Sequence, residues 1–139
     1  MTAEIFVDSG AWIAISDRSD QHHRPAIATY RDLLRSPRIL VTSNLVVAES
    51  YILVRRSAGH ETAMRFLRSL RQSSRLLKVY SDAALESRAE ELLARYADQD
   101  FSFVDAVSFA LMQRRNIAQA FTFDRHFLVA GFTRVPPPA

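Results

Sequence analysis

The stretch "EIFVDSG" (residues 4–10) contains a short apolar run that ends at an acid. Residues 4–7 are predicted to form a strand, and Asp8 follows this strand directly. Four further apolar runs are also predicted to be strands, and they cover residues 38–42, 76–80, 119–123 and 132–135. Short apolar runs of this kind, bounded by polar residues, are typical of buried strands.

Longer segments with helical periodicity separate the predicted strands. We expect helices at residues 25–34, 45–57, 61–70, 83–96 and 103–115, with a short turn at residues 11–16 before the first helix. Gly59 is a candidate C-cap, and Ser81 or Asp82 is a candidate N-cap. Strands that alternate with helices imply right-handed βαβ units, a parallel sheet and helices on both of its faces. The sequence therefore predicts an α/β fold.

The length and composition of the chain limit its possible functions. The 139 residues fit one domain, residues 1–139, and the tail "PPPA" (residues 136–139) is expected to fray. The absence of cysteine excludes disulfides and zinc–thiolate sites and suits a cytoplasmic protein. We expect no membrane segment and no signal peptide. The net charge is +3, and Lys78 is the single lysine among 18 basic residues, so a polyanionic partner is plausible, although compositional bias toward arginine would give the same pattern.

Four acids stand in otherwise apolar segments. Asp8 and Asp124 each follow a predicted strand, and Asp105 lies in the first turn of the helix that leads to the fourth strand. Ligands gather at the carboxyl ends of strands in open parallel sheets. If the first and fourth strands are neighbours, these three aspartates lie at one edge of the sheet. Glu49 is the fourth acid, in the middle of a predicted helix.

Each acid also has a purely structural interpretation. Asp8 and Asp124 could cap short helical segments, and Asp105 could form a capping box with Ser102. Glu49 is too far inside its helix to cap it. Its helical neighbours form an apolar stripe, where an unpaired charge would be costly, so an ion pair with Arg55 or Arg56 is the structural alternative. The stripe consists of Leu45, Val46, Ile52 and Leu53.

Carboxylates that converge on one edge would repel one another, and a divalent cation is the simplest partner that stabilises them. Oxygen ligands without cysteine or convergent histidine favour Mg²⁺ or Mn²⁺ over zinc. Such a centre on a basic protein indicates phosphodiester hydrolysis. A series of arginines could bind the nucleic-acid backbone, or could simply form a solvated helix face: Arg55, Arg56, Arg65, Arg68, Arg71 and Arg75.

Four motifs in order, "FVDSGAWIA", "TSNLVVAESY", "FSFVDAVSFALM" and "TFDRHF", resemble those of the PIN-domain ribonucleases, and most closely the VapC-type toxins of toxin–antitoxin pairs. The resemblance implies a three-layer α/β/α sandwich with a mostly parallel five-stranded sheet. It also implies that Asp8 and Asp105 are the main metal ligands, with Glu49 as the helix-borne acid and Asp124 as the acid of the T-x-D-x-x-F element. Two polar residues would line the site: Ser9 and Thr122.

The resemblance further implies a divalent-metal-dependent endoribonuclease with Mg²⁺ or Mn²⁺ as cofactor, RNA as substrate, and products with a 5′-phosphate and a 3′-hydroxyl. Arg65 and Arg68 are the candidate RNA contacts. The expected partners are a cognate antitoxin and a second copy of the chain in a homodimer. Two alternatives stay open: a PIN-fold module that binds RNA or protein without nuclease activity, and a PIN nuclease of RNA processing unrelated to toxin–antitoxin function.

Other enzyme classes fit the sequence less well. Aspartyl-phosphate phosphatases need a second aspartate two residues after the first, where this chain has Gly10. A receiver domain needs a lysine near the site, and Lys78 is misplaced for that role. A nucleotide-binding loop needs more than the three glycines present. The adjacent pair His22 and His23 would point apart, so a joint metal site there is not expected.

Overall fold

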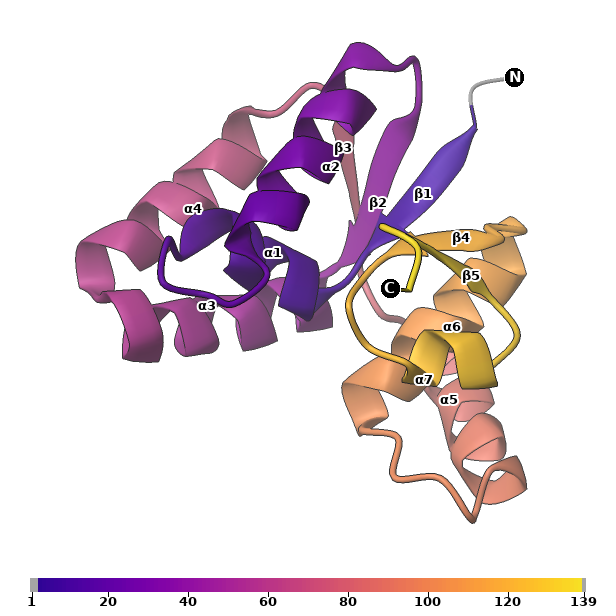
Figure 1. Cartoon of the computed structure of the whole chain (residues 1–139). Helices are drawn as coiled ribbons and strands as arrows, with labels where there is room; N and C mark the ends of the chain where they lie inside the picture. The colour runs from indigo at the N-terminus through magenta and orange to yellow at the C-terminus, as the bar shows by residue number, and fades with distance from the viewer. Residues whose placement is uncertain (1–2, 139) are drawn as a thin grey trace.

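The computed structural model describes residues 3–138, and its centre is a five-stranded parallel sheet (Figure 1). The order of the strands is β3-β2-β1-β4-β5, and every neighbouring pair is parallel. The predicted α/β fold with a mostly parallel five-stranded sheet is confirmed. The strands are β1 (Glu4–Val7), β2 (Ile39–Ser43), β3 (Leu76–Val79), β4 (Gln119–Phe121) and β5 (Thr133–Val135).

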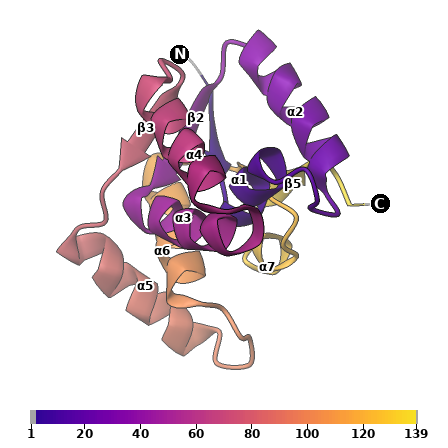
Figure 2. The same ribbon diagram turned by 90° about the vertical axis from the view of Figure 1, so that its left-hand side faces the viewer.

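Helices cover both faces of this sheet. Helices α1 to α4 gather on one side and α5 to α7 on the other, which gives the three layers (Figures 1 and 2). The bounds are α1 (Ser9–Ser16), α2 (His23–Arg35), α3 (Asn44–Ala58), α4 (His60–Gln72), α5 (Ala83–Arg95), α6 (Phe103–Arg115) and α7 (His126–Val129).

The helix boundaries follow local chemistry. Gly59 ends α3 with a φ of +94°, a conformation that favours glycine. The Asp82 side chain accepts a hydrogen bond from the backbone N–H of Leu85, and so caps α5. One prediction was wrong, because the expected short turn at residues 11–16 is an eight-residue helix that begins at Ser9. Pro136 to Pro138 lie outside helices and strands, and Ala139 lies outside the described residues.

The strand order creates a switch point next to β1. The chain adds β2 and β3 on one side of β1 and then crosses to add β4 and β5 on the other. Val7 pairs with Phe121 in the parallel register of β1 and β4, so the next residues, Asp8 and Thr122, lie side by side. Ligands bind at such a crevice, at the carboxyl ends of the strands, in open α/β sheets.

Helix α6 runs through the core on the side of α5 and α7. Its residues 106–112 are all buried, so the middle of α6 is enclosed on every side, while its last turn is exposed and polar. The Phe109 ring packs edge-on against Phe127, at 4.9 Å between centroids, and Phe127 also packs against Phe6 of β1. These contacts fix the start of α6 and the short helix α7 relative to the end of β1. Within residues 3–138, no helix has the length and apolarity that a membrane crossing requires.

Candidate metal centre

Asp8 is the most buried of the four acids. Asp8 occupies the predicted N-cap position of α1, but its side chain makes no capping hydrogen bond, so capping does not account for the carboxylate. Asp8 Oδ2 instead accepts a 3.0 Å hydrogen bond from the Thr122 hydroxyl. Burial raises the pKa of Asp8 to about 7, and the negative charges of Asp105 and Asp124 act in the same direction. Hydrogen bonds from the Ser9 backbone and from Thr122 lower the pKa and offset part of this rise.

Asp124 stands at the end of the segment that follows β4. Its backbone N–H donates to Thr122 Oγ1 over 3.0 Å, and its Oδ1 accepts from the backbone N–H of His126 over 2.9 Å. The bond to the His126 N–H holds the chain just before α7, but the N-cap position of α7 belongs to Arg125, so the prediction that Asp124 is the N-cap was wrong. The bond uses one carboxylate oxygen, so it does not exclude a metal bond.

Asp105 both caps helix α6 and lies beside the other acids of the site. Ser102 Oγ accepts from the Asp105 backbone N–H, and Asp105 Oδ2 accepts from the Ser102 N–H, both over 3.0 Å. This reciprocal pair is the predicted capping box. Burial and the charge of Asp124 raise the pKa of Asp105, while Ser102 and His126 act in the opposite direction. The capping box thus holds the Asp105 carboxylate beside the other acids. Its hydrogen bonds lower the pKa of Asp105 only in part, so the pKa stays above its ordinary value.

Glu49 of α3 is joined to the site through Ser9. The Ser9 hydroxyl donates a 2.6 Å hydrogen bond to Glu49 Oε1, and Ser9 directly follows Asp8. The predicted apolar stripe was wrong in part, because Ile52 and Leu53 are each 37% exposed and Glu49 itself is half-buried. Within residues 3–138, no ion pair involves Glu49, so the alternative Glu–Arg pair is absent as well.

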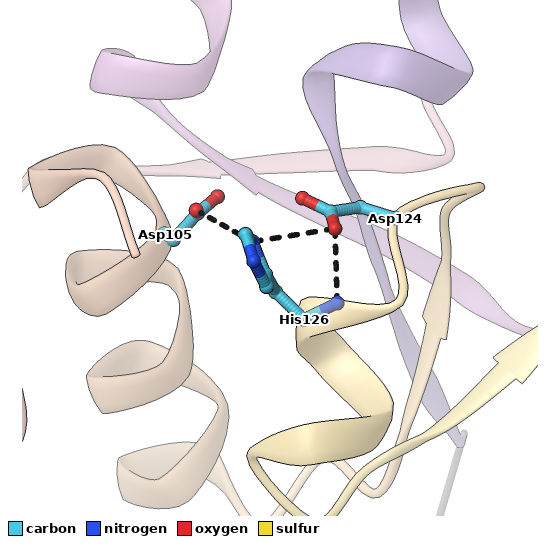
Figure 3. A group of neighbouring side chains, drawn as sticks. All are labelled: Asp105, Asp124 and His126. Carbon is cyan, nitrogen blue, oxygen red and sulfur yellow. Dashed lines mark hydrogen bonds and ion pairs between the residues drawn. The ribbon is translucent and has the colours of Figure 1, made fainter. Parts of the chain in front are cut away.

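The sequence reasoning missed His126. Its Nδ1 lies 3.6 Å from Asp105 Oδ2 and 3.4 Å from Asp124 Oδ1, so the ring stands between the two carboxylates (Figure 3). The available signal was the histidine two residues after Asp124 in "TFDRHF", but a sequence does not show which way a ring points. Ligand atoms of Asp105, Asp124 and His126 lie within 4.8 Å of one another, a spacing that could hold a metal ion.

The donor set suits a divalent cation. The pKa values of Asp8 and Asp105 are raised, mainly by burial and also by the negative charge of neighbouring carboxylates. The buried Nδ1 atom of His126 has no hydrogen-bond partner within the described residues. A cation next to Asp8, Asp105 and Asp124 would neutralise the repulsion and supply a partner for this nitrogen.

The arginines predicted to bind nucleic acid have different surroundings. Arg65 lines a pocket of about 460 Å³ between α1, α2 and α4, together with Arg18 and Arg31. Arg68 is exposed on α4. The assignment of Arg75 was wrong, because its guanidinium donates to backbone carbonyls at the end of α2 and in the following loop, which belong to Leu33, Leu34, Ser36 and Arg38.

Comparisons with known proteins agree with this geometry. The family model of the PIN domain matches residues 5–132. The chain is 36% identical over 133 residues to the 23S rRNA-specific endonuclease VapC20 of Mycobacterium tuberculosis. The aligned region covers 96% of this chain and 98% of that protein. The crystal structure of VapC20, described as a sarcin-ricin loop cleaving toxin, superposes with a TM-score of 0.86 and 35% identity over 93% of this chain and 96% of that chain.

A more distant solved structure, FitAcB from Neisseria gonorrhoeae, superposes with a TM-score of 0.61 at 18% identity. That superposition covers 94% of this chain and 95% of the other. At this identity the likeness concerns the fold alone. The same sheet and helices therefore support proteins of widely different sequence.

Proposed function

This chain belongs to the PIN-domain family, and from that premise we propose that it is a divalent-metal-dependent endoribonuclease and the toxin of a toxin–antitoxin pair. One observation carries the proposal. Asp8, Asp105 and Asp124 converge beside the switch point between β1 and β4, where burial and mutual repulsion raise the pKa values of the first two. Three carboxylates brought together in this way make a site for a hard divalent cation.

The residues of the centre have distinct tasks. Asp8, Asp105 and Asp124 would hold the cation, which would supply a water of lowered pKa and neutralise charge on the leaving oxygen. Thr122 holds Asp8 Oδ2, and Ser9 holds Glu49 beside the site. The proposed cofactor is Mg²⁺ or Mn²⁺, and the proposed products carry a 5′-phosphate and a 3′-hydroxyl.

RNA is the proposed substrate. Support comes from VapC20, which is named for cleavage of 23S rRNA and matches this chain over 96% of its length. The first RNA to test is therefore 23S rRNA, at its sarcin–ricin loop. A basic surface is consistent with such a substrate, since the chain carries 18 basic and 15 acidic residues.

The arginine pocket is the proposed RNA-backbone contact. Ser16, which lines the pocket, is the last residue of the helix that Ser9 begins. Eight helical residues extend about 10 Å along the axis, so α1 links the acidic centre at one end with the pocket at the other. We place one RNA phosphate near Arg65, Arg18 and Arg31, with Arg68 contacting the strand beyond them.

A cognate antitoxin and a second copy of this chain are the proposed protein partners. Apolar side chains on the surface could form part of either interface: Ile52 and Leu53 are each 37% exposed on α3, and Phe103 is 41% exposed on α6. Light scattering of the purified chain measures the proposed dimer. Co-expression with the product of the neighbouring reading frame tests the antitoxin, which should relieve growth arrest caused by this chain.

The nuclease itself is tested by mapping cleavage sites in total RNA with and without a chelator. The wild type should cleave only with the metal, and Asp8→Asn or Asp105→Asn should abolish cleavage while the circular dichroism spectrum stays unchanged. Asp98→Asn is the matched control, because Asp98 is an exposed loop acid close to α6 in sequence. Undiminished cleavage by either site variant would refute the assignment of the centre, and an inactive wild type that still binds RNA would favour the binding-module alternative.

A further inference from the structure

We propose that His126 binds the cation directly through Nδ1, so that the centre has a nitrogen ligand and prefers Mn²⁺ to Mg²⁺. This inference rests on the proposed function, since it concerns the same metal. It goes beyond the acids of the family motifs, because it adds a ligand of another chemical class.

The first observation is the position of Nδ1. This atom is buried and makes no hydrogen bond within the described residues, although it lies 3.4 Å from Asp124 Oδ1 and 3.6 Å from Asp105 Oδ2. Two ligands on one ion, with bonds of about 2.1 Å, lie roughly 3 Å apart when they meet at a right angle. Small side-chain shifts would therefore place Nδ1 and both carboxylates on one cation.

The second observation is the partner of the opposite nitrogen. Nε2 of His126 lies 3.0 Å from Asp100 Oδ1, and Asp100 is 88% exposed. An ionised carboxylate only accepts, so Nε2 carries the hydrogen, and a neutral ring then presents the lone pair of Nδ1 to the acids. Histidines that bind metals usually donate their other N–H to a carboxylate in this way.

The third observation is that the ring is held in place. The backbone N–H of His126 donates to Asp124 Oδ1 over 2.9 Å, and the ring packs edge-on against Phe101 at 5.1 Å between centroids. The adjacent residue, Phe127, is completely buried. The orientation of Nδ1 toward Asp105 and Asp124 is thus set by packing before any ion binds, as a metal ligand requires.

A proton is the competing occupant. A proton on Nδ1 would also relieve the repulsion between the lone pair and the two carboxylates. Both nitrogen–oxygen distances, 3.4 and 3.6 Å, are longer than ordinary hydrogen bonds of this kind. A cation has an advantage, because it would also neutralise Asp8, whose pKa is raised first by burial and next by the charges of Asp105 and Asp124.

The nitrogen ligand has a consequence for metal choice. Mg²⁺ takes oxygen ligands and keeps several waters, whereas first-row transition ions also accept imidazole. Replacing His126 should therefore weaken the binding of Mn²⁺ more than the binding of Mg²⁺. We expect His126→Gln to lower Mn²⁺ affinity about 10- to 100-fold, the usual effect of disturbing a histidine ligand or its support, and to change Mg²⁺ affinity less than about threefold.

Pulsed electron paramagnetic resonance of the Mn²⁺-loaded full-length chain tests the ligand directly. The wild type should show coupling of the Mn²⁺ electron spin to a nitrogen, and His126→Gln should lose it. His60→Gln is the matched control, since the His60 ring contacts Arg55 instead, and it should retain the coupling. Because the wild-type spectrum needs no variant, a folding defect in His126→Gln leaves the test intact.

Calorimetry separates this inference from the proposed function. Mn²⁺ binding that depends on Asp8 but shows no nitrogen coupling would overturn the role of His126 and leave the metal nuclease standing. Nitrogen coupling that persists in His126→Gln, or equal losses of Mn²⁺ and Mg²⁺ affinity, would also overturn it. The absence of any Mn²⁺ or Mg²⁺ binding would overturn both. Asp100→Asn should lower the Mn²⁺ affinity, as His126→Gln does, but by a smaller factor.

Discussion

The side chains of Asp8 and Thr122 are joined by a 3.0 Å hydrogen bond across 114 residues of sequence. The parallel pairing of Val7 with Phe121 places them side by side at the carboxyl ends of β1 and β4. The same Thr122 hydroxyl accepts a hydrogen bond from the backbone N–H of Asp124. One buried hydroxyl therefore positions two of the acids, and the strand register is what brings it there.

Replacing Thr122 with valine should shift the pH profile of the enzyme. The Thr122 hydrogen bond lowers the pKa of Asp8, so its loss raises that pKa further above 7. The metal-binding carboxylate form then appears at higher pH, and cleavage at pH 7 should fall about tenfold, the size expected for a hydrogen bond to a charged group. Rates measured between pH 6 and 9 check this, and Thr122→Ser should restore the profile. A valine variant whose profile coincides with the wild type would contradict it.

Asp8→Asn should stabilise the metal-free protein above neutral pH. The pKa of Asp8 is about 7 in the folded chain against its ordinary value of 3.8, so between these two pH values the folded state binds more protons than the unfolded state. Stability of the wild type therefore decreases as the pH rises from about 4 to 7, and the full penalty is present above pH 7. Asparagine carries no such charge, and it should be more stable by on the order of 2–4 kcal/mol at pH 8.

Urea unfolding of Asp8→Asn and wild type at several pH values, with a chelator present, measures this difference. Added Mn²⁺ should then stabilise the wild type and leave the asparagine variant unchanged, because only the wild type retains the binding site. A stability gap that does not change between pH 5 and 8 would show that Asp8 stays ionised without metal. The exposed Asp98→Asn variant is the control for a general effect of removing negative charge.

The sheet and the positions of three acids could be predicted because they depend on local pattern. A short apolar run that ends at an acid gave β1 and Asp8, and Ser102 with Asp105 marked the start of α6. The convergence of these acids was predicted on the condition that the first and fourth strands are neighbours, and the structure fulfils that condition. These features need only the periodicity of the chain and the usual chemistry of helix starts.

The remaining features depend on side-chain orientation and tertiary contacts. Glu49 was assigned to the site partly on the expectation of an apolar stripe, yet Ile52 and Leu53 are each 37% exposed, because the fold and not the sequence pattern decides which side of α3 is covered. His126 was missed because its role comes from a ring held between Asp105 and Asp124. Arg75 looks like its basic neighbours in sequence, and only the fold turns it toward backbone carbonyls.

Ser102→Ala should separate the structural role of the capping box from the chemistry of Asp105. Loss of the hydroxyl removes the acceptor for the Asp105 N–H and should cost about 1 kcal/mol of stability. The carboxylate remains, and its bond to the Ser102 backbone is unaffected, so cleavage should stay within a few-fold of the wild type. Thermal unfolding and RNA cleavage together check this. A loss of activity as large as that of Asp105→Asn would mean that the cap itself positions the ligand.

Ser9 and Glu49 should behave as a coupled pair. The 2.6 Å hydrogen bond from Ser9 is to a carboxylate, so Ser9→Ala should reduce the cleavage rate about tenfold and Glu49→Gln should reduce it further. If Ser9 acts by positioning Glu49, the double variant should match Glu49→Gln, as a double-mutant cycle on kcat/KM would show. Additive losses would instead indicate that Ser9 contacts the RNA directly.

Arg75 and Arg65 should give opposite results although they lie ten positions apart in one basic segment. Arg75 donates to the Leu34 carbonyl over 2.8 Å and to three further carbonyls, and so ties the last turn of α2 to the loop that follows it. Arg75→Met should therefore lower the free energy of unfolding by roughly 2–3 kcal/mol, with unchanged cleavage per folded molecule. Arg65→Gln should leave stability unchanged, because within the described residues its one polar contact is a 3.2 Å bond to Thr62 on the surface.

RNA affinity measured at several salt concentrations completes this comparison. Each phosphate contact to a single strand contributes about −0.7 to the slope of log affinity against log salt, so Arg65→Gln should flatten the slope by about that amount. Arg75→Met should retain the wild-type slope, since its guanidinium is engaged with backbone carbonyls in the fold. The reverse pattern, a flattened slope for Arg75→Met alone, would move the RNA path away from the pocket between α1, α2 and α4.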